Sequence, residues 1–344
     1  MSTTSPIRGA HLVGSVLLAD AEEVFRTVSS ALGSRLQRLP DGETGERSEW
    51  IMWQWDALKD SPGLLPAVDA NSVYGTRPQV KPRHGLSAEE VEINPLGYAK
   101  AAIGSYQLFA QLKQEGVIPG HLRFQVSLPT PLAPVTAFVA QEDRPIVEPA
   151  YEAAMLREVA EIVAAIPHDD LAIQWDIARE FAILEGVSQP HFNNSEDGIR
   201  DRIARLSSAV PEDVEIGYHL CYGDFGHRHF AQPKDATHLK NMANAISEHV
   251  QRPIAWIHFP VPVDRHDEAY FEPLREIRLH PETELYVGLI HHSDGVEGAR
   301  RRIEAAQQVL GDFGVGTECG WGRRPVETIP ELLRIHAEVS EPVV

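Results

Sequence analysis

Cysteine, positive charge and long apolar segments are all scarce in this chain of 344 residues. Two cysteines, Cys221 and Cys319, are too few for a disulfide framework, so we expect free thiols in a reducing compartment. Fifty acidic residues against 31 basic ones give a formal net charge of -19, which repels nucleic-acid phosphates and anionic membrane surfaces. No apolar run reaches the roughly 18 residues of a membrane span, and the N-terminal segment lacks a small-residue cleavage site. These scarcities predict a cytoplasmic protein that binds neither nucleic acid nor membrane.

The composition is otherwise that of a globular protein, with 43% hydrophobic and 24% charged residues. Short apolar or β-branched runs predict eight strands, at 10–17, 34–39, 121–128, 171–176, 214–221, 253–259, 284–291 and 313–318. Helical periodicity follows most of them, at 20–32, 96–115, 147–165, 197–209, 236–250, 268–277, 296–310 and 326–339. This alternation, without GxGxxG after the first strand, predicts an α/β fold, a single (β/α)8 TIM barrel over residues 1–344.

A long connection, residues 44–97, follows the second predicted strand. It contains many Pro and Gly residues, shows little helical period, and far exceeds the usual length of about two to six residues. Loops that follow barrel strands lie on the face that carries the active site. We therefore expect residues 44–97 to be a long loop insertion that serves as a lid or substrate wall, and not a second domain.

Four side chains at predicted strand ends have the chemistry of metal ligands. His219 and Cys221 are two residues apart, which places both on one face of a strand. Cys319 ends the last strand and His258 ends the sixth, so all four reach the same barrel mouth. Two imidazoles and two thiolates suit Zn²⁺. Alternatively, each cysteine is a small buried apolar residue, and His258 caps a strand end or hydrogen-bonds to substrate.

The segments HLCYGDF, IHFP, GLIHHSDG and GVGTECGWGRR, in that order on strands five to eight, resemble the C-terminal catalytic barrel of cobalamin-independent methionine synthase, a relative of uroporphyrinogen decarboxylase. The resemblance implies a zinc-dependent methyltransferase in which a metal-bound thiolate attacks a methyl donor. Zinc in that family is held by an HxC pair, a glutamate and a later cysteine. His219, Cys221 and Cys319 match three of these ligands, and His258 stands where the glutamate is expected.

The resemblance also implies a place for an amino-acid substrate. Val13, Gly14 and Ser15 resemble the family's IGS segment, with Ser15 as the substrate-binding hydroxyl. Asp41, Gly42 and Glu43 resemble its HGE motif, and Asp176 resembles its strand-four aspartate, so Glu43 and Asp176 are expected to bind the substrate ammonium. Read without the resemblance, Glu43 caps a helix start and Asp176 pairs with Arg179.

His292, followed by Ser293, stands where the family keeps its proton donor. Its neighbour His291 points to the opposite face of the strand and is expected to be structural. Arg323 and Arg324 follow the last metal ligand, where they either clamp an anionic substrate or lie on the surface. His227 and His229 lie on an irregular loop and are not expected to form a second metal site.

The specific part of the resemblance lies after residue 170, and the chain has room for one barrel, whereas full-length methionine synthases have two. We therefore expect a zinc-dependent methyl or alkyl transferase that activates a small-molecule thiol, with folate, a corrinoid or another small molecule as methyl donor. One alternative is a zinc-dependent lyase or hydrolase acting in the same barrel mouth. Another is a non-catalytic zinc-binding protein. An oligomer is compatible with each of them.

Overall fold

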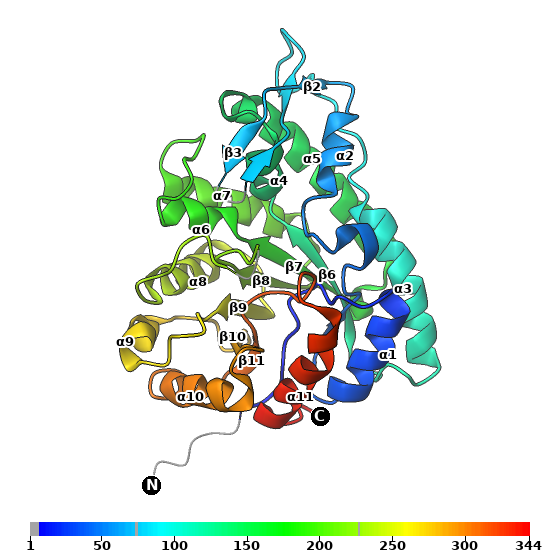
Figure 1. The fold of residues 1–344 in the computed structure, drawn as a ribbon. Helices are drawn as coiled ribbons and strands as arrows, with labels where there is room; N and C mark the ends of the chain where they lie inside the picture. The colour runs from blue at the N-terminus through cyan, green and yellow to red at the C-terminus, as the bar shows by residue number, and fades with distance from the viewer. Residues whose placement is uncertain (1–6, 73–74, 226–227) are drawn as a thin grey trace.

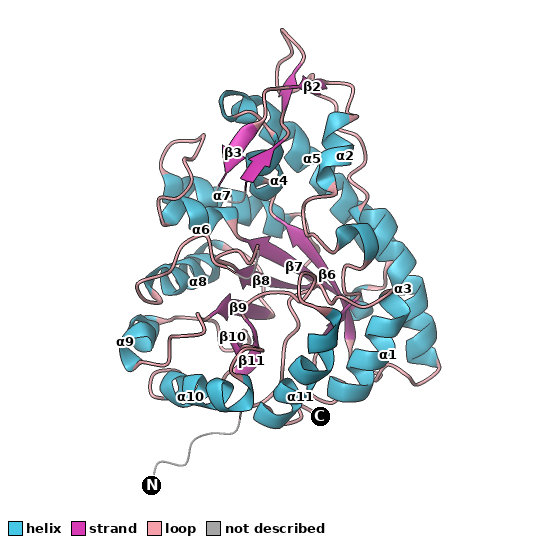
Figure 2. Ribbon diagram, in the orientation of Figure 1, coloured by secondary structure: helices cyan, strands magenta, loops and turns pink. Residues whose placement is uncertain are grey.

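The structure is a computed structural model that describes residues 7–72, 75–225 and 228–344 (Figure 1). Its centre is a parallel sheet of seven strands in the order β1-β6-β7-β8-β9-β10-β11. These strands are β1 (Arg38–Pro40), β6 (Arg123–Pro129), β7 (Leu171–Ile177), β8 (Glu215–Leu220), β9 (Trp256–Pro260), β10 (Glu284–Ile290) and β11 (Gly314–Thr317). The sheet is curled, with helices around it (Figure 2). This is an α/β fold compatible with a TIM-barrel-like arrangement.

The longer helices are α1 (Ala21–Leu32), α3 (Tyr98–Gln114), α5 (Arg144–Ala165), α7 (Ser195–Ser208), α8 (Thr237–His249), α10 (Gly295–Gln307) and α11 (Ile329–Val339). The shorter ones are α2 (Gln54–Lys59), α4 (Leu132–Phe138), α6 (Arg179–Leu184) and α9 (Glu268–Phe271). Helix α1 begins where the Asp20 side chain accepts a hydrogen bond from the Glu23 amide, and it buries Val24, Phe25 and Val28. Among the described residues, no helix combines the length and apolar character that a membrane span requires.

The first predicted strand, residues 10–17, does not form as a continuous strand. The segment makes isolated parallel bridges instead, from Ala10 to Val315 and from Ser15 to Gly42. Side chains occupy the carbonyls that a strand ladder would use, because the Gln125 side-chain amide donates to Leu12 and Val13 and other side chains also donate to Val13. The prediction of a regular strand at residues 10–17 was therefore wrong, although the segment lies where that strand was expected.

The connection between β1 and α3 is more structured than the loop predicted for residues 44–97. It contains α2 and two small antiparallel sheets, β2 (Leu64–Pro66) with β5 (Val80–Pro82), and β3 (Ala70–Ser72) with β4 (Gly75–Arg77). Each strand has three residues, too few for alternation to show in the sequence. Ile51, Leu58 and Leu64 are buried in the main core and anchor the segment to it.

A buried cation joins the beginnings of several strands. Arg38, at the start of β1, donates to Glu215 of β8 at 2.7 Å and to Glu284 of β10 at 2.6 Å. Its guanidinium carbon lies 4.3 Å from the ring centroid of Trp256 in β9. Arg123 of β6 pairs with the second oxygen of Glu215. The amino ends of five strands are thus held by one group of charges.

Replacing Arg38 by Met should lower the free energy of unfolding by roughly 2–4 kcal/mol, because it leaves two glutamates facing each other without their shared cation. Chemical denaturation measures the change. The matched control is Arg334→Met, which removes an exposed arginine paired with Glu331 and Glu338 and should leave stability almost unchanged. Equal effects of the two substitutions would contradict the role given to Arg38.

Candidate metal and substrate site

A pocket of about 850 Å³, open solvent at its mouth included, lies at the carboxyl ends of the strands. The residues that line it come from the 10–16 segment, β7, β8, the loops after β8 and β11, and the 44–97 connection. The sequence-predicted residues in its wall are Ser15, Glu43, Asp176, His219, Cys221, Cys319 and Arg323. The parallel sheet thus brings together residues that are more than 300 positions apart in the chain.

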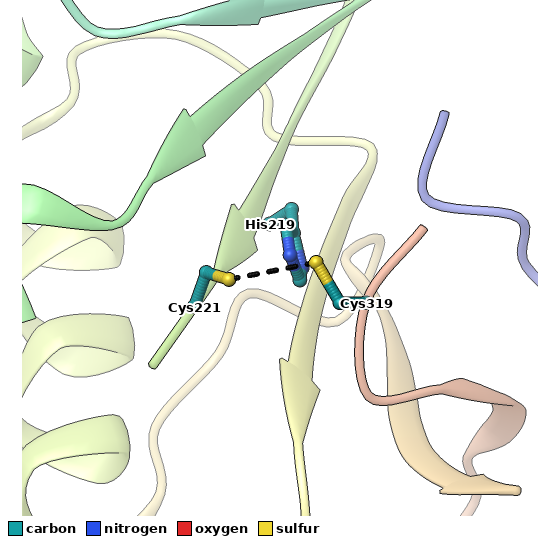
Figure 3. Close-up of side chains that lie close together, drawn as sticks. All are labelled: His219, Cys221 and Cys319. Carbon is teal, nitrogen blue, oxygen red and sulfur yellow. Dashed lines mark hydrogen bonds between the residues drawn. The ribbon is translucent and has the colours of Figure 1, made fainter. Parts of the chain in front are cut away.

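Three predicted metal ligands converge in this pocket. One ligand atom each of His219, Cys221 and Cys319 lies within 4.8 Å of the others. The two sulfur atoms are 3.8 Å apart, and both cysteines are free (Figure 3). His219 lies on β8 and Cys221 directly follows that strand, as a spacing of two requires, and Cys319 lies just after β11. The geometry brings one imidazole and two thiols to a single point.

The donors around this point fit a soft or borderline cation such as zinc. Nε2 of His219 is buried and has no hydrogen-bond partner, which is costly unless an ion uses its lone pair. The Gly223 amide donates to Cys221 Sγ at 3.2 Å, which helps to fix the position of this sulfur. The hydrogen bond to Cys221 and burial raise the pKa of Cys319 well above its ordinary value, and a bound cation would oppose that rise.

His258 lies beside the group of three and not within it. It is the parallel-register partner of His219, and the two Nδ1 atoms are 2.8 Å apart. Burial lowers the pKa of His219 well below its ordinary value and that of His258 to about 3, so both rings are neutral. A single proton between the two Nδ1 atoms then leaves Nε2 of His219 facing the thiols. His258 therefore contacts His219, one of the predicted ligands, and does not itself lie where a fourth ligand would be.

Glu43, which is half-buried, and the buried Asp176 place two carboxyl groups in the same pocket. Trp50 Nε1 donates to one oxygen of Asp176 at 3.2 Å, and Gln174 Nε2 donates to the other at 2.9 Å. Burial, followed by the nearby charge of Asp176, raises the pKa of Glu43 to about 8. Burial raises the pKa of Asp176 to about 7. A cation between the two groups would let both ionise, which is the arrangement expected for binding an ammonium.

The residues around Glu43 and Ser15 explain how these two side chains are placed. Asp41 accepts from the Glu43 amide and from Arg47, so it braces the turn that carries Glu43. Ser15 Oγ accepts from the Gly322 amide at 3.1 Å, next to the loop that carries Cys319. The Ser15 contact connects a predicted substrate residue to the loop that carries Cys319.

Neither of the two histidines after β10 is among the residues that line the pocket. His291 is buried, with Nε2 2.8 Å from the Val261 carbonyl and Nδ1 3.0 Å from Glu318. His292 is half-exposed, acts on the pKa of Glu331 of α11, and does not line the pocket. The register of β10 against β11 shifts between Val287 and Ile290, and one extra residue reverses the facing of everything after it. A strict alternation of side-chain directions along the strand does not predict this bulge.

Sequence reasoning missed two buried acids beside Cys319. Asp224 lines the pocket, and burial together with the charge of Glu318 raises its pKa to about 7. Glu318 pairs with His291 and with Arg324 at 2.6 Å, so Arg324 supports the site from behind while Arg323 reaches the pocket. Asp224 and Glu318 are close in sequence to Cys221 and Cys319, and this closeness could have identified them as candidate site residues. Of the loop histidines, His227 lies outside the described residues.

His229, the other loop histidine, packs its ring 5.8 Å from that of Tyr222, and burial lowers its pKa. It is not among the three residues grouped as metal donors in the described part of the chain.

Comparison with known proteins yields structural relatives, whereas no family model and no curated protein sequence matches the chain. One relative is a Listeria monocytogenes protein provisionally assigned as a vitamin-B12-independent methionine synthase (TM-score 0.57, 15% identity, 97% of each chain). Another is a B12-independent methionine synthase from Shewanella sp. W3-18-1 in complex with selenomethionine (0.56, 14%, 97% of this chain and 98% of that one). A third is a methyltransferase from Methanosarcina mazei (0.50, 12%, 98% and 95%). At these identities the likeness shows the fold, that of methionine synthase-like structures.

The carboxyl pair predicts a pH-dependent stability. Glu43 has a pKa near 8 in the folded protein against an ordinary value of 4.5, so between these pH values the folded protein keeps a proton that the unfolded chain has released. Stability contributed by this group is therefore lost as pH rises through that window. Glu43→Gln should exceed the wild type in unfolding free energy by roughly 1–4 kcal/mol at pH 8 and by little at pH 4.5.

Denaturation curves at the two pH values measure this difference. Glu22→Gln, a substitution of an exposed glutamate on α1, is the matched control and should show no such dependence. A Glu43→Gln variant whose advantage stays constant with pH would contradict the raised pKa.

Proposed function

We propose that this protein is a zinc-dependent transferase that moves a methyl or other alkyl group to the sulfur of a small thiol. The observation that carries the proposal is the shared pocket, in which ligand atoms of His219, Cys221 and Cys319 come together at one point while Glu43 and Asp176 form a separate, acidic floor. Such a pocket accommodates a molecule with a thiol at one end and an ammonium at the other. The methionine synthase-like fold supports the same reaction class.

The substrate is an amino thiol whose ammonium lies between Glu43 and Asp176. Its positive charge offsets the repulsion that keeps one of these carboxyls protonated. Ser15, fixed by the Gly322 amide, is available to the substrate's polar groups. The Shewanella relative was solved with selenomethionine, an alkylated product of this chemical class, and this supports the assignment.

His219, Cys221 and Cys319 would hold the zinc, and the substrate thiol would bind next to them in the pocket. When bound, zinc lowers the pKa of a coordinated thiol, so that the nucleophilic thiolate exists at neutral pH. His258 is a positioning residue: its contact with His219 Nδ1 keeps Nε2 of His219 available as a ligand atom. The 44–97 connection, which contributes Trp50 and Met52 to the pocket wall, serves as the lid.

A lyase or hydrolase reaction is the second candidate, favoured by the buried Asp224 in the pocket wall, whose pKa of about 7 suits a general acid or base. The two candidate functions can be distinguished by the rate at which iodoacetamide alkylates a small thiol such as homocysteine. A transferase should activate the thiol and so accelerate its alkylation in the presence of the zinc-loaded protein. Unchanged alkylation would favour the second candidate.

Freshly purified protein should contain about one zinc per chain by elemental analysis. A Cys221→Ser, Cys319→Ser double variant should lose the metal, because the hydroxyl is a far poorer zinc ligand than the thiolate. His336→Gln, which replaces a fully buried histidine held by the Leu332 carbonyl, is the control and should keep full zinc content. Full retention in the double variant would overturn the site.

The His258→Leu variant separates a positioning residue from a ligand. It should keep zinc stoichiometry while its affinity, measured by competition with a chelator, falls by roughly 10–100-fold. Complete loss of zinc at micromolar protein would instead make His258 a ligand.

The bulge in β10 leads us to expect that His291, and not His292, is needed for turnover. His291→Asn breaks the contacts to Glu318 and Val261 next to Cys319 and should reduce kcat by roughly 10²-fold or more. His292→Asn, its immediate neighbour, should retain nearly all activity because its half-exposed side chain acts on Glu331 of α11. Zinc content is measured in both. Loss of turnover in His292→Asn alone would restore the alternating register expected from the sequence.

A further inference from the structure

Trp50 reaches the pocket through a backbone conformation that a bulky residue does not favour. Its φ angle is 57°, in the left-handed region, where a side chain of this size is strained. Among the described residues, the other non-glycine residues with positive φ are Glu43 and Asn194, and asparagine tolerates this region. Glu43 and Trp50 both line the pocket. Two of these three residues therefore belong to one site.

Neighbouring contacts hold the segment of Trp50 in this conformation. The Trp50 amide donates to the Arg47 carbonyl at 3.0 Å, and Ile51 is buried in the main core. Gly322, in the loop after β11, approaches the Ser48 carbonyl so closely that a side-chain carbon at this glycine would lie 2.5 Å from the oxygen. A strained residue persists only where its surroundings over-determine it, and such residues are common at ligand sites.

The indole of Trp50 is one of two uncharged donors to Asp176. Trp50 Nε1 donates to one carboxylate oxygen at 3.2 Å, and Gln174 Nε2 donates to the other at 2.9 Å. Each carboxylate oxygen has two lone-pair directions, so each can accept a further hydrogen bond. The two donors thus fix the orientation of the carboxylate without supplying a positive charge.

Other buried carboxylates in the chain are paired with arginine. Asp41 accepts from Arg47 at 2.6 Å, and Glu318 accepts from Arg324 at the same distance. Within the described part of the chain, no lysine or arginine forms an ion pair with Asp176. A buried carboxylate without a cation is costly, which favours a ligand that brings one.

We propose that Trp50 is a positioning residue that makes the pocket specific for substrates with an ammonium group. Its N–H fixes the orientation of the Asp176 carboxylate, and the ammonium supplies the positive charge that the two donors lack. An analogue without the amine would leave this carboxylate without a counter-ion. The inference rests on the proposed function in taking the ligand to be an amino thiol or its alkylated product.

L-Methionine and 4-(methylthio)butanoate, which is methionine without its amino group, test this role by isothermal titration calorimetry. Neither ligand has a thiol, so their binding does not require a metal-bound thiolate. The wild type should bind methionine roughly 10–100-fold more tightly than the analogue. Trp50→Phe keeps an aromatic ring and removes the N–H donor, so it should weaken methionine binding by roughly 10-fold and leave the analogue nearly unchanged.

Trp53→Phe is the matched control, because the Trp53 ring packs on Tyr98 at a centroid distance of 4.7 Å, and it should bind methionine like the wild type. A second measurement needs no variant: in NMR spectra of wild-type protein with isotope-labelled tryptophan, methionine should shift one of the six indole N–H signals, and the analogue should not. Equal binding of the two ligands to the wild type, or equal weakening of both in Trp50→Phe, would overturn the inference.

Unchanged methionine binding in Trp50→Phe would also overturn it. Each of these results would leave the zinc and thiol-alkylation tests of the proposed function unaffected. Absent zinc or unchanged thiol alkylation, together with methionine binding that depends on Trp50, would overturn the transferase and not the role of Trp50.

Discussion

One buried amide, the side chain of Gln174 in the middle of β7, joins the parts on which the pocket floor depends. Its nitrogen donates to the Val13 carbonyl and to Asp176, and its oxygen meets Trp256 Nε1 and His11 Nε2. It thus connects the 10–16 segment, β7 and β9. Because Gln174 is fully buried, its amide has no water to bond to in place of these groups. Buried hydrogen bonds of this kind make the surrounding core rigid, and they fix the arrangement of the floor.

The same network explains why the N-terminal segment departs from regular strand structure without leaving its place. A continuous ladder would need the carbonyls of Leu12 and Val13, and Gln125 and Gln174 already use them. The segment keeps only single bridges to its neighbours, which frees Ser15 to reach the loop after β11. The irregular backbone of this segment thus allows Ser15 to take its place in the pocket.

Most of the architecture could be predicted from sequence because parallel strands buried on both sides appear as short apolar runs. Seven of the eight expected strands formed, and the spacing of His219 and Cys221 was sufficient to place both at one point. Three features were not accessible in this way. The bulge of β10 depends on pairing with β11, the three-residue strands of the 44–97 connection are too short to show a period, and the contact of His258 with His219 depends on register between strands.

The spacing of the two cysteines has a consequence for how the molecule folds. Cys221 and Cys319 are 98 positions apart, and the chain between them forms β9, β10, β11 and the helices that connect them. An ion held by both thiols would close that whole loop and would act as a crosslink on the C-terminal third of the protein. Closing a loop of this length removes much of the freedom of the unfolded chain. Metal supply would then govern how cooperatively the last strands join the sheet, in addition to any chemistry at the pocket.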